Sequence, residues 1–323
     1  MQAHSLVSAR TFRVRPRGGC LSAHAYDEGM RQLSVSARVR IVSALVEGNS
    51  IRATCRMTGA AKRTVLRLLA DLGAACRAYH DANVCEVKAS RVQCDEIWAF
   101  VFAKDKNVLE DERDLGRGSV WTWTGIDADS KLIIGYHVGT RDAACANEFI
   151  SDLASRLVGR IQLTTDGLKS YLEAVEGAFG ADVDYAMLIK LYGEVNPGEA
   201  RYSPPKCTGS RKETITGRPD MDHVSTSYVE RANLTMRMGM RRFTRLTNGF
   251  SKKVENHEHA VALHFMHYNF CRVHQTLRVT PAMQAGLSEH VWSLEELVAL
   301  IPEPTVAPWG SRLAALKIAG NSK

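Results

Sequence analysis

The chain has 323 residues, of which 45% are hydrophobic and 24% are charged, so it has the length for two or three domains and the apolar content for a large core. Its eight cysteines form no C-x-x-C pair, which argues against a zinc ribbon or a secreted disulfide framework and favours a cytoplasmic protein. No apolar run approaches the roughly 18–20 residues that cross a membrane, so we expect no membrane association.

Charge is distributed unevenly along the chain, whose formal net charge is +7. Residues 1–90 carry 14 Lys and Arg against 6 Asp and Glu, residues 91–224 carry 16 against 22, and residues 225–280 carry 9 against 3. Two basic segments around an acidic one predict a polyanion such as DNA, held on both sides of a cation-binding site. The alternative is an ordinary solvated surface.

Residues 1–30 carry several arginines but no apolar segment of the kind found in a secretory signal. They also show no hydrophobic period. We predict either a disordered arm or an over-long start, in which case Met30 replaces Met1 as the initiator.

Residues 31–88 predict an all-α DNA-binding domain. Apolar residues recur at helical spacing over 31–47, Ser50 is placed to cap a second helix that Gly59 ends, and a third helix follows over 61–79. Helix, glycine turn and helix in this order are typical of a helix-turn-helix module. The polar residues at the start of the third helix suit the major groove of DNA: Lys62, Arg63, Thr64 and Arg67. The alternative is a three-helix bundle with a charged outer face.

Residues 91–179 predict an α/β domain. The segment 91–102, RVQCDEIWAFVF, is typical of a buried strand, although Asp95 and Glu96 lie in its middle. Burying a carboxylate is costly unless a cation or hydrogen-bond donors compensate its charge. Further strands are predicted over 120–126, 132–138 and 161–165, and helices over 147–157 and 169–179. Three strands, a helix, a strand and a helix predict an antiparallel meander joined to parallel strands.

The remaining segments alternate between loops and helices. Residues 104–117 and 190–222 are rich in charged residues, glycine or proline and predict loops. Helices are predicted over 227–240, 254–273 and 288–301.

Three acids stand at positions suited to metal binding. Asp95 is in mid-strand, Asp166 closes a second strand, and Glu230 lies in the first turn of a helix. Because ligands gather beyond the strand ends of open α/β sheets, these carboxylates are candidates to hold two Mg²⁺ ions for phosphodiester chemistry.

Each of these acids also has a structural interpretation. Asp166-Gly167 is a possible turn pair, and Ser227-x-x-Glu230 has the spacing of a capping box. Asp127, in the strand predicted to pair with 91–102, is a reserve ligand.

The helix that follows Glu230 carries a basic face. Asn233, Arg237 and Arg241 lie 3, 7 and 11 residues after Glu230, close to one helical face. An acid and two arginines on one face suit phosphate chemistry. The basic run continues in residues suited to contact the DNA backbone: Arg242, Arg245, Lys252 and Lys253. Neither a P-loop, nor a G-x-S-x-G nucleophile, nor an H-E-x-x-H zinc motif occurs in the chain.

Five longer sequence motifs are more specific than the spacing of single residues. They are CDEIWAF at 94–100, WTWTGIDADSKLI at 121–133, LTTDGLKSYLEAVEGAFG at 163–180, STSYVERANLTMRMGMRRFTRLTNGFSKK at 225–253 and YNFCRVHQTLRVTPAM at 268–283. Over about residues 32–301 the chain resembles bacterial insertion-element transposases of the DDE class, of the insertion-sequence-one type.

The resemblance implies a ribonuclease-H-like catalytic domain in which Asp95, Asp166 and Glu230 are the metal-binding catalytic acids and Asn233 supports them. It implies two Mg²⁺ or Mn²⁺ ions. The DNA partners are the terminal repeats of the element and the target, which are cleaved and joined by activated water and a freed 3′-hydroxyl. It also implies a homo-oligomer that brings two DNA ends together, in the bacterial cytoplasm with the nucleoid. Some members carry an N-terminal zinc finger, which this chain lacks, so recognition of the ends depends on the helix-turn-helix.

Four domains or segments are therefore predicted. They are an arm over 1–30, a helix-turn-helix domain over 31–88, a ribonuclease-H-like domain over 89–285 with a loop-rich insert at 190–222, and a C-terminal helix and tail over 286–323. The alternative functions are a DNA-binding repressor or domesticated relative without strand transfer, and a nuclease that hydrolyses without joining.

Strand alternation places Asp95 and Glu96 on opposite faces. Only one of them is then expected to share a site with Asp166 and Glu230. Periodicity leaves the choice open. The resemblance selects Asp95 and makes Glu96 a supporting acid.

Overall fold

The computed structural model describes residues 33–113, 115–193, 207–244 and 247–302. The chain divides into two units, Met1–Ser34 and Val35–Lys323, and every element below belongs to the second unit. Residues on both sides of the boundary predicted at residue 88 belong to that unit. The predicted N-terminal arm and Arg245 lie outside the described residues, as does the tail after residue 302.

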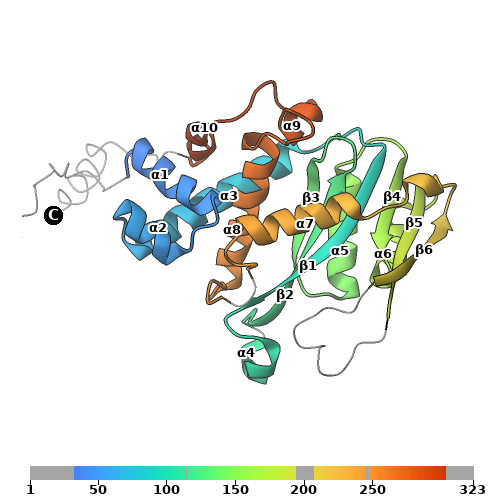
Figure 1. Ribbon diagram of the computed structural model, residues 1–323, viewed down its shortest axis with the longest axis horizontal. Helices are drawn as coiled ribbons and strands as arrows, with labels where there is room; N and C mark the ends of the chain where they lie inside the picture. The colour runs from blue at the N-terminus through green and yellow to red at the C-terminus, as the bar shows by residue number, and fades with distance from the viewer. Residues whose placement is uncertain (1–32, 114, 194–206, 245–246, 303–323) are drawn as a thin grey trace, which may run out of the picture. The chain divides into compact units, whose positions relative to one another are not determined.

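A six-stranded mixed sheet forms the centre of the fold (Figure 1). Its strands are β1 (Arg91–Val101), β2 (Gly118–Asp127), β3 (Ile133–Gly139), β4 (Ile161–Asp166), β5 (Val183–Tyr192) and β6 (Cys207–Thr216), in the order β3-β2-β1-β4-β5-β6. The first three strands are an antiparallel meander, β4 and β5 run parallel to β1, and β6 is antiparallel to β5. This confirms the predicted mixed α/β class, and the sheet with its flanking helices is compatible with a ribonuclease-H-like fold.

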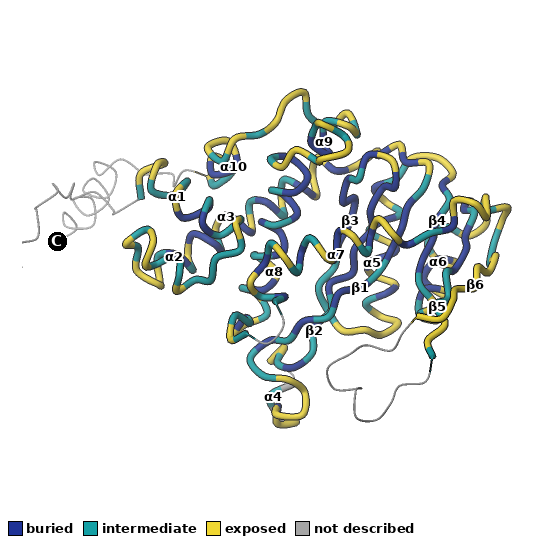
Figure 2. Tube along the Cα trace, viewed as in Figure 1, coloured by how far each residue is buried: buried dark blue, intermediate teal, exposed yellow. Residues whose placement is uncertain are grey.

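Helices cover both faces of the sheet. On one face, α5 (Ala143–Ser155) and α6 (Ser170–Phe179) pack against Trp123, whose ring lies 6.0 Å from that of Phe149 and 5.4 Å from that of Tyr171. On the other face lies α7 (Ser227–Gly239), which begins over Gln93 of β1. Figure 2 shows the central strands buried between these layers, so β1 is a core strand as its composition predicts.

Two predicted loops contain regular structure. Residues 104–117 include a 3-10 helix at Asp105–Asn107 and the short helix α4 (Glu110–Arg113). Strand β6 lies within the predicted loop-rich insert at 190–222, although residues 194–206 are outside the described part. Most side chains of β6 are exposed, so no apolar alternation signals a strand there. Backbone pairing with β5 holds this edge instead.

In the part of the chain that the structure describes, three helices precede the sheet: α1 (Val35–Val46), α2 (Ile51–Thr58) and α3 (Lys62–Asn83). The predicted caps of α2 are confirmed. Ser50 Oγ accepts a hydrogen bond from the Ala53 amide at 3.1 Å, and Gly59 adopts the left-handed conformation with φ of 72°. The described residues after α7 include α8 (Val254–Met266), which ends in a π-helical turn, α9 (Pro281–Gln284) and α10 (Leu294–Ala299).

Helices α3 and α8 approach each other closely at Gly73. A Cβ built on Gly73 would lie 2.5 Å from the Cβ of His259 and 2.6 Å from its Cα. We expect Gly73→Ala to separate the two helices and to lower the free energy of unfolding by about 1–3 kcal/mol, as overpacking does. Thermal unfolding measures the effect.

Gly177→Ala is the matched control, because Gly177 lies inside α6 and a Cβ there meets nothing within 4 Å. This control is expected to stabilise the protein by about 0.5–1 kcal/mol, since alanine is the better helix former. Equal melting temperatures for the two variants would contradict the close approach at Gly73.

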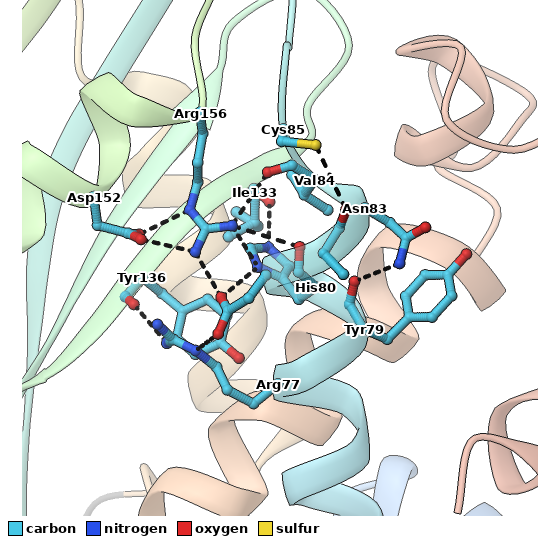
Figure 3. A network of polar contacts seen from close by, with 12 residues as sticks. Arg77, Tyr79, His80, Asn83, Val84, Cys85, Ile133, Tyr136, Asp152 and Arg156 are labelled. Atoms are coloured by element: carbon cyan, nitrogen blue, oxygen red, sulfur yellow. Dashed lines mark hydrogen bonds and ion pairs between the residues drawn. The ribbon is translucent and has the colours of Figure 1, made fainter.

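A buried polar network joins the C-terminal half of α3 to the sheet (Figure 3). Arg156 at the end of α5 donates to Asp152 Oδ2 and Oδ1, both at 2.8 Å, to Asp81 Oδ1 at 2.6 Å and to the Val84 carbonyl at 3.1 Å. Arg77 donates to the Tyr136 carbonyl on β3 at 3.1 Å. The Arg156 side chain is only 6% exposed, so the network is a structural link that fixes α3 against α5 and β3.

Candidate metal centre

Three carboxylates converge where β1 lies beside the end of β4. Asp95, Glu96 and Asp166 each offer an oxygen, and these oxygens lie within 4.8 Å of one another. The parallel register explains the meeting: Gln93 pairs with Thr164, so two residues further along each strand Asp95 comes beside Asp166. Two of the three predicted catalytic acids are therefore together.

The expectation that only one of Asp95 and Glu96 shares a site with Asp166 is wrong. The two acids do point to different faces, since Asp95 Oδ2 accepts from Asn233 Nδ2 at 2.9 Å and Glu96 Oε2 accepts from Arg141 Nε at 3.0 Å. Asp166 is the last residue of β4, so its side chain is not confined to one face of a continuing strand. The Asp166 carboxylate therefore lies close to both Asp95 and Glu96.

The start of α7 is held by β1. Gln93 Oε1 accepts hydrogen bonds from the backbone amides of Tyr228 at 2.8 Å and Val229 at 3.2 Å, as a cap supplied by another element. Gln93 and Asp95 are two residues apart and share a strand face. This cap therefore places Asn233, one helical turn beyond Glu230, over the Asp95 carboxylate.

Glu230 lies beside the three acids rather than among them. Its Oε1 accepts from Lys190 Nζ at 2.6 Å, and the Thr226 hydroxyl also donates to it. The predicted alternative of a capping box at Ser227 is wrong, because Thr226 is the N-cap residue and the Glu230 carboxylate turns toward Lys190 on β5. Its negative charge still contributes to the raised pKa of Asp95 and of Asp166.

Burial controls the protonation of the centre. Loss of hydration, followed by repulsion from Asp166, raises the pKa of Asp95 to about 6 and the pKa of Glu96 to about 7. Burial also raises the pKa of Asp166, against the lowering effects of the Leu168 amide and of the positive charges of Arg141 and Lys190. Carboxylates that repel one another in a buried site are suited to bind a cation.

The donor set fits a hard divalent cation. Glu96 Oε1, on a side chain only 1% exposed, is buried without a well-formed hydrogen bond, although the Tyr171 hydroxyl lies near enough to Glu96 to offset part of the rise in its pKa that burial causes; Asn233 Oδ1 is also buried and unpaired. Oxygen ligands of this kind are the ones that Mg²⁺ and Mn²⁺ take in proteins. A cation at the centre would satisfy oxygens that the protein itself leaves unsatisfied.

Asp127 is not available as a reserve ligand. It pairs with Val92, three residues before Asp95 on β1, and its carboxylate accepts from the Ser130 amide at 3.0 Å and the Ser130 hydroxyl at 2.5 Å. The acid shapes the turn between β2 and β3. Asp129, in the same turn, forms an ion pair with Arg91.

Arg141, Lys190 and Gln93 were not predicted as site residues. Arg141 bridges Glu96 and Asp166, with its guanidinium 4.8 Å from the Trp121 ring centroid. Arg141 precedes α5 and Lys190 lies on β5, so neither has a local pattern that connects it to Asp95. Gln93 did carry a signal: it is a polar residue in an apolar strand, on the face of Asp95.

The predicted DNA-contacting residues fall into two groups. One lies at the start of α3, where Lys62, Arg63 and Arg67 are exposed and Thr64 is half-buried. The other follows Glu230, with Arg237 half-buried on α7 and the remaining residues, Arg241, Arg242, Lys252 and Lys253, between α7 and α8. Because α7 ends at Gly239, the expectation that Arg241 shares its helical face with Glu230 is wrong.

No protein-family model matches the chain, and none of the curated proteins matches it. Among solved structures, a cryo-electron-microscopy structure of the piggyBac transposase synaptic complex with hairpin DNA is similar, with a TM-score of 0.37 and 10% sequence identity over 88% of this chain and 75% of that one. This likeness is distant. None of the described helices is long and apolar enough to cross a membrane.

Metal binding is expected to stabilise the protein more at pH 8 than at pH 5. The pKa values of about 6 for Asp95 and about 7 for Glu96 exceed the ordinary carboxylate range. These two acids therefore bind more protons in the folded state than in the unfolded state, and their contribution to the stability of the metal-free protein falls as pH rises from about 4 to about 7. A divalent ion replaces those protons at pH 8, and at a hundredfold excess over its Kd it adds about 2.7 kcal/mol.

Thermal unfolding with and without Mn²⁺ at both pH values tests this expectation. Asp222→Asn, which removes an exposed acid elsewhere, should keep the metal effect. An equal rise in melting temperature at pH 5 and pH 8 would contradict metal binding by these acids.

Proposed function

We propose that the chain is a DNA transposase that cleaves DNA at the ends of an insertion element and joins them to target DNA. The observation that carries this proposal is the convergence of three largely buried carboxylates, Asp95, Glu96 and Asp166, where β1 lies beside the end of β4. The DDE-type motifs around Asp95, Asp166 and Glu230 support the same function.

Asp95, Asp166 and Glu230 are proposed to hold two Mg²⁺ or Mn²⁺ ions, with Glu96 as a further oxygen donor. When bound, such ions activate an attacking oxygen and stabilise a leaving one in phosphodiester chemistry. The protein's own groups orient the acids: Asn233 holds the Asp95 carboxylate, and Arg141 holds Glu96 and Asp166. Lys190 supplies positive charge to Glu230 in the metal-free protein.

DNA is the proposed substrate and partner. Helices α2 and α3 are proposed to act as a helix-turn-helix whose residues Lys62, Arg63, Thr64 and Arg67 face the major groove. The second basic group contacts the phosphate backbone: Arg237, Arg241, Arg242, Arg245, Lys252 and Lys253. Two DNA ends must be brought together for transposition, so a homo-oligomer is proposed as the acting form.

A strand-transfer assay tests the proposal. Labelled duplexes carrying the inverted repeats that flank the reading frame are incubated with the full chain, a target plasmid and Mn²⁺. Nicked ends and joined products are the expected result. Hydrolysis without joining would identify a nuclease instead, and sequence-specific binding without cleavage would identify a repressor.

A further inference from the structure

A basic cleft lies between the N-terminal helices and the link from α7 to α8. Its volume is about 730 Å³, and residues from α1, α2, α3 and α8 share its lining with the segments 239–242 and 248–252. We define the basic cleft by the five cationic residues that line it: Arg52, Lys62, Arg241, Arg242 and Lys252. Among the described residues, neither an aspartate nor a glutamate lines it. A concave surface with one sign of charge attracts an anion.

Arg242 differs from the other four cationic residues because part of its guanidinium is buried. Its Nε has no hydrogen-bond partner and no contact with solvent. Burial lowers the pKa of Arg242 to about 10, and no carboxylate among the described residues opposes that effect. An unpaired buried charge costs free energy that the fold does not recover by itself.

The neighbours of Arg242 cannot neutralise it. His257, in α8, has its pKa lowered to about 3, first by burial and then by the Arg242 charge, so it is neutral near pH 7. Its Nε2 is buried and also unpaired, while its Nδ1 lies 3.4 Å from Ser251 Oγ. The remaining polar lining consists of neutral side chains such as Asn49, Asn248 and Asn256. None of the described neighbours supplies a counter-charge for Arg242, so a bound anion would satisfy its buried Nε.

We propose that the basic cleft binds a phosphate of the DNA backbone, with Arg242 as its buried receptor and Arg52 as a further contact. This deepens, and rests on, the proposed action on DNA. Guanidinium groups bind phosphate oxygens through paired hydrogen bonds, which suits a partly buried arginine better than a loose surface contact.

The position of the basic cleft connects the two proposed DNA-contacting groups. Lys62 belongs to the start of α3, whereas Arg241 and Arg242 follow the helix that begins beside Glu230. From Asn233, which lies over Asp95, to Met240 the rise along α7 is about 10 Å, which equals the rise of about three base pairs of DNA. A phosphate in the basic cleft would lie at that distance along α7 from the acids, and it would fix the register of the strand presented to them.

Binding of a fluorescein-labelled linear duplex by the full chain, in EDTA and over a series of salt concentrations, tests this inference. Arg242→Met is expected to weaken binding by about tenfold to a hundredfold, the effect of losing a charged hydrogen bond. It should also reduce the slope of log affinity against log salt by about one. The melting temperature should stay equal or rise, because a buried unpaired charge is removed.

Two further variants complete the design. Arg52→Gln, at an exposed residue of the cleft, should weaken binding and flatten the salt slope even if Arg242→Met folds poorly. Arg218→Gln removes one exposed charge outside the cleft and should leave both unchanged.

Native affinity and slope in both Arg242→Met and Arg52→Gln would overturn the inference, as would a native chain that binds no DNA. The experiment uses no metal and no chemistry, so it is independent of the strand-transfer assay. Strand transfer by the native chain together with undiminished binding by the cleft variants would reject the cleft and leave the proposed function intact.

Discussion

Asp95→Asn is expected to reduce DNA cleavage and strand transfer by about a thousandfold or more, because it removes a charge that we propose to bind metal where the reaction would take place. The variant should fold. An asparagine at this position has nearly the same volume, and its carbonyl oxygen can still accept the hydrogen bond that Asn233 Nδ2 donates at 2.9 Å. Strand-transfer product from labelled DNA ends, with Mn²⁺ present, measures the loss.

The same variant has a second readout that separates a metal-site role from simple damage. Repulsion between Asp95 and Asp166 contributes to the raised pKa of Asp95, so removal of the Asp95 charge should raise the melting temperature of the metal-free protein at pH 8. The stabilisation by Mn²⁺ should shrink in parallel. Asp222→Asn is again the control, and full activity of Asp95→Asn would reject the proposed catalytic role.

Arg156→Met is expected to lower the free energy of unfolding by about 1–3 kcal/mol, the cost of leaving a buried acceptor without its donor, because the two carboxylates that it pairs with are 41% and 32% exposed and can regain water. The substitution leaves two carboxylates, Asp81 and Asp152, and the Val84 carbonyl without the guanidinium that they share. The methionine side chain fills part of the space but donates no hydrogen bond. Equilibrium unfolding in guanidinium chloride measures the change.

Arg160→Met is the matched control for this prediction. Arg160 also forms a paired contact with an aspartate, Asp184 Oδ1 at 2.8 Å and Oδ2 at 3.0 Å, but its side chain is 45% exposed, whereas that of Arg156 is 6% exposed. Water replaces an exposed guanidinium at little cost. Similar losses in the two variants would show that burial of the Arg156 network does not contribute to stability as argued.

Local pattern was sufficient for most segments that contact the core along one face, but it missed β5, whose residues Val183, Tyr185 and Met187 are buried. The strands β1, β2, β3 and β4 and the helices α5 and α6 follow the predicted order, because their apolar residues repeat at the period of the structure that buries them. It failed for β6, whose side chains are largely exposed. Strand β6 is stabilised by backbone hydrogen bonds to β5. Such hydrogen bonds do not depend on side-chain type, so the sequence pattern of 207–216 does not reveal them.

For the candidate site, residue positions made Asp95, Glu96 and Asp166 candidates, and the resemblance selected Asp95 over Glu96. The mixed order of elements predicted the sheet in which Asp95 and Asp166 lie side by side. The orientation of the acids and the charges around them depend on contacts between residues far apart in the sequence. Gln93 of β1 caps α7 and thereby sets Asn233 over Asp95, and Lys190 of β5 reaches Glu230 across 40 positions of sequence. Side-chain alternation is a property of a single strand. It therefore could not predict that Asp166, at the end of β4, lies close to acids on both faces of the neighbouring strand β1.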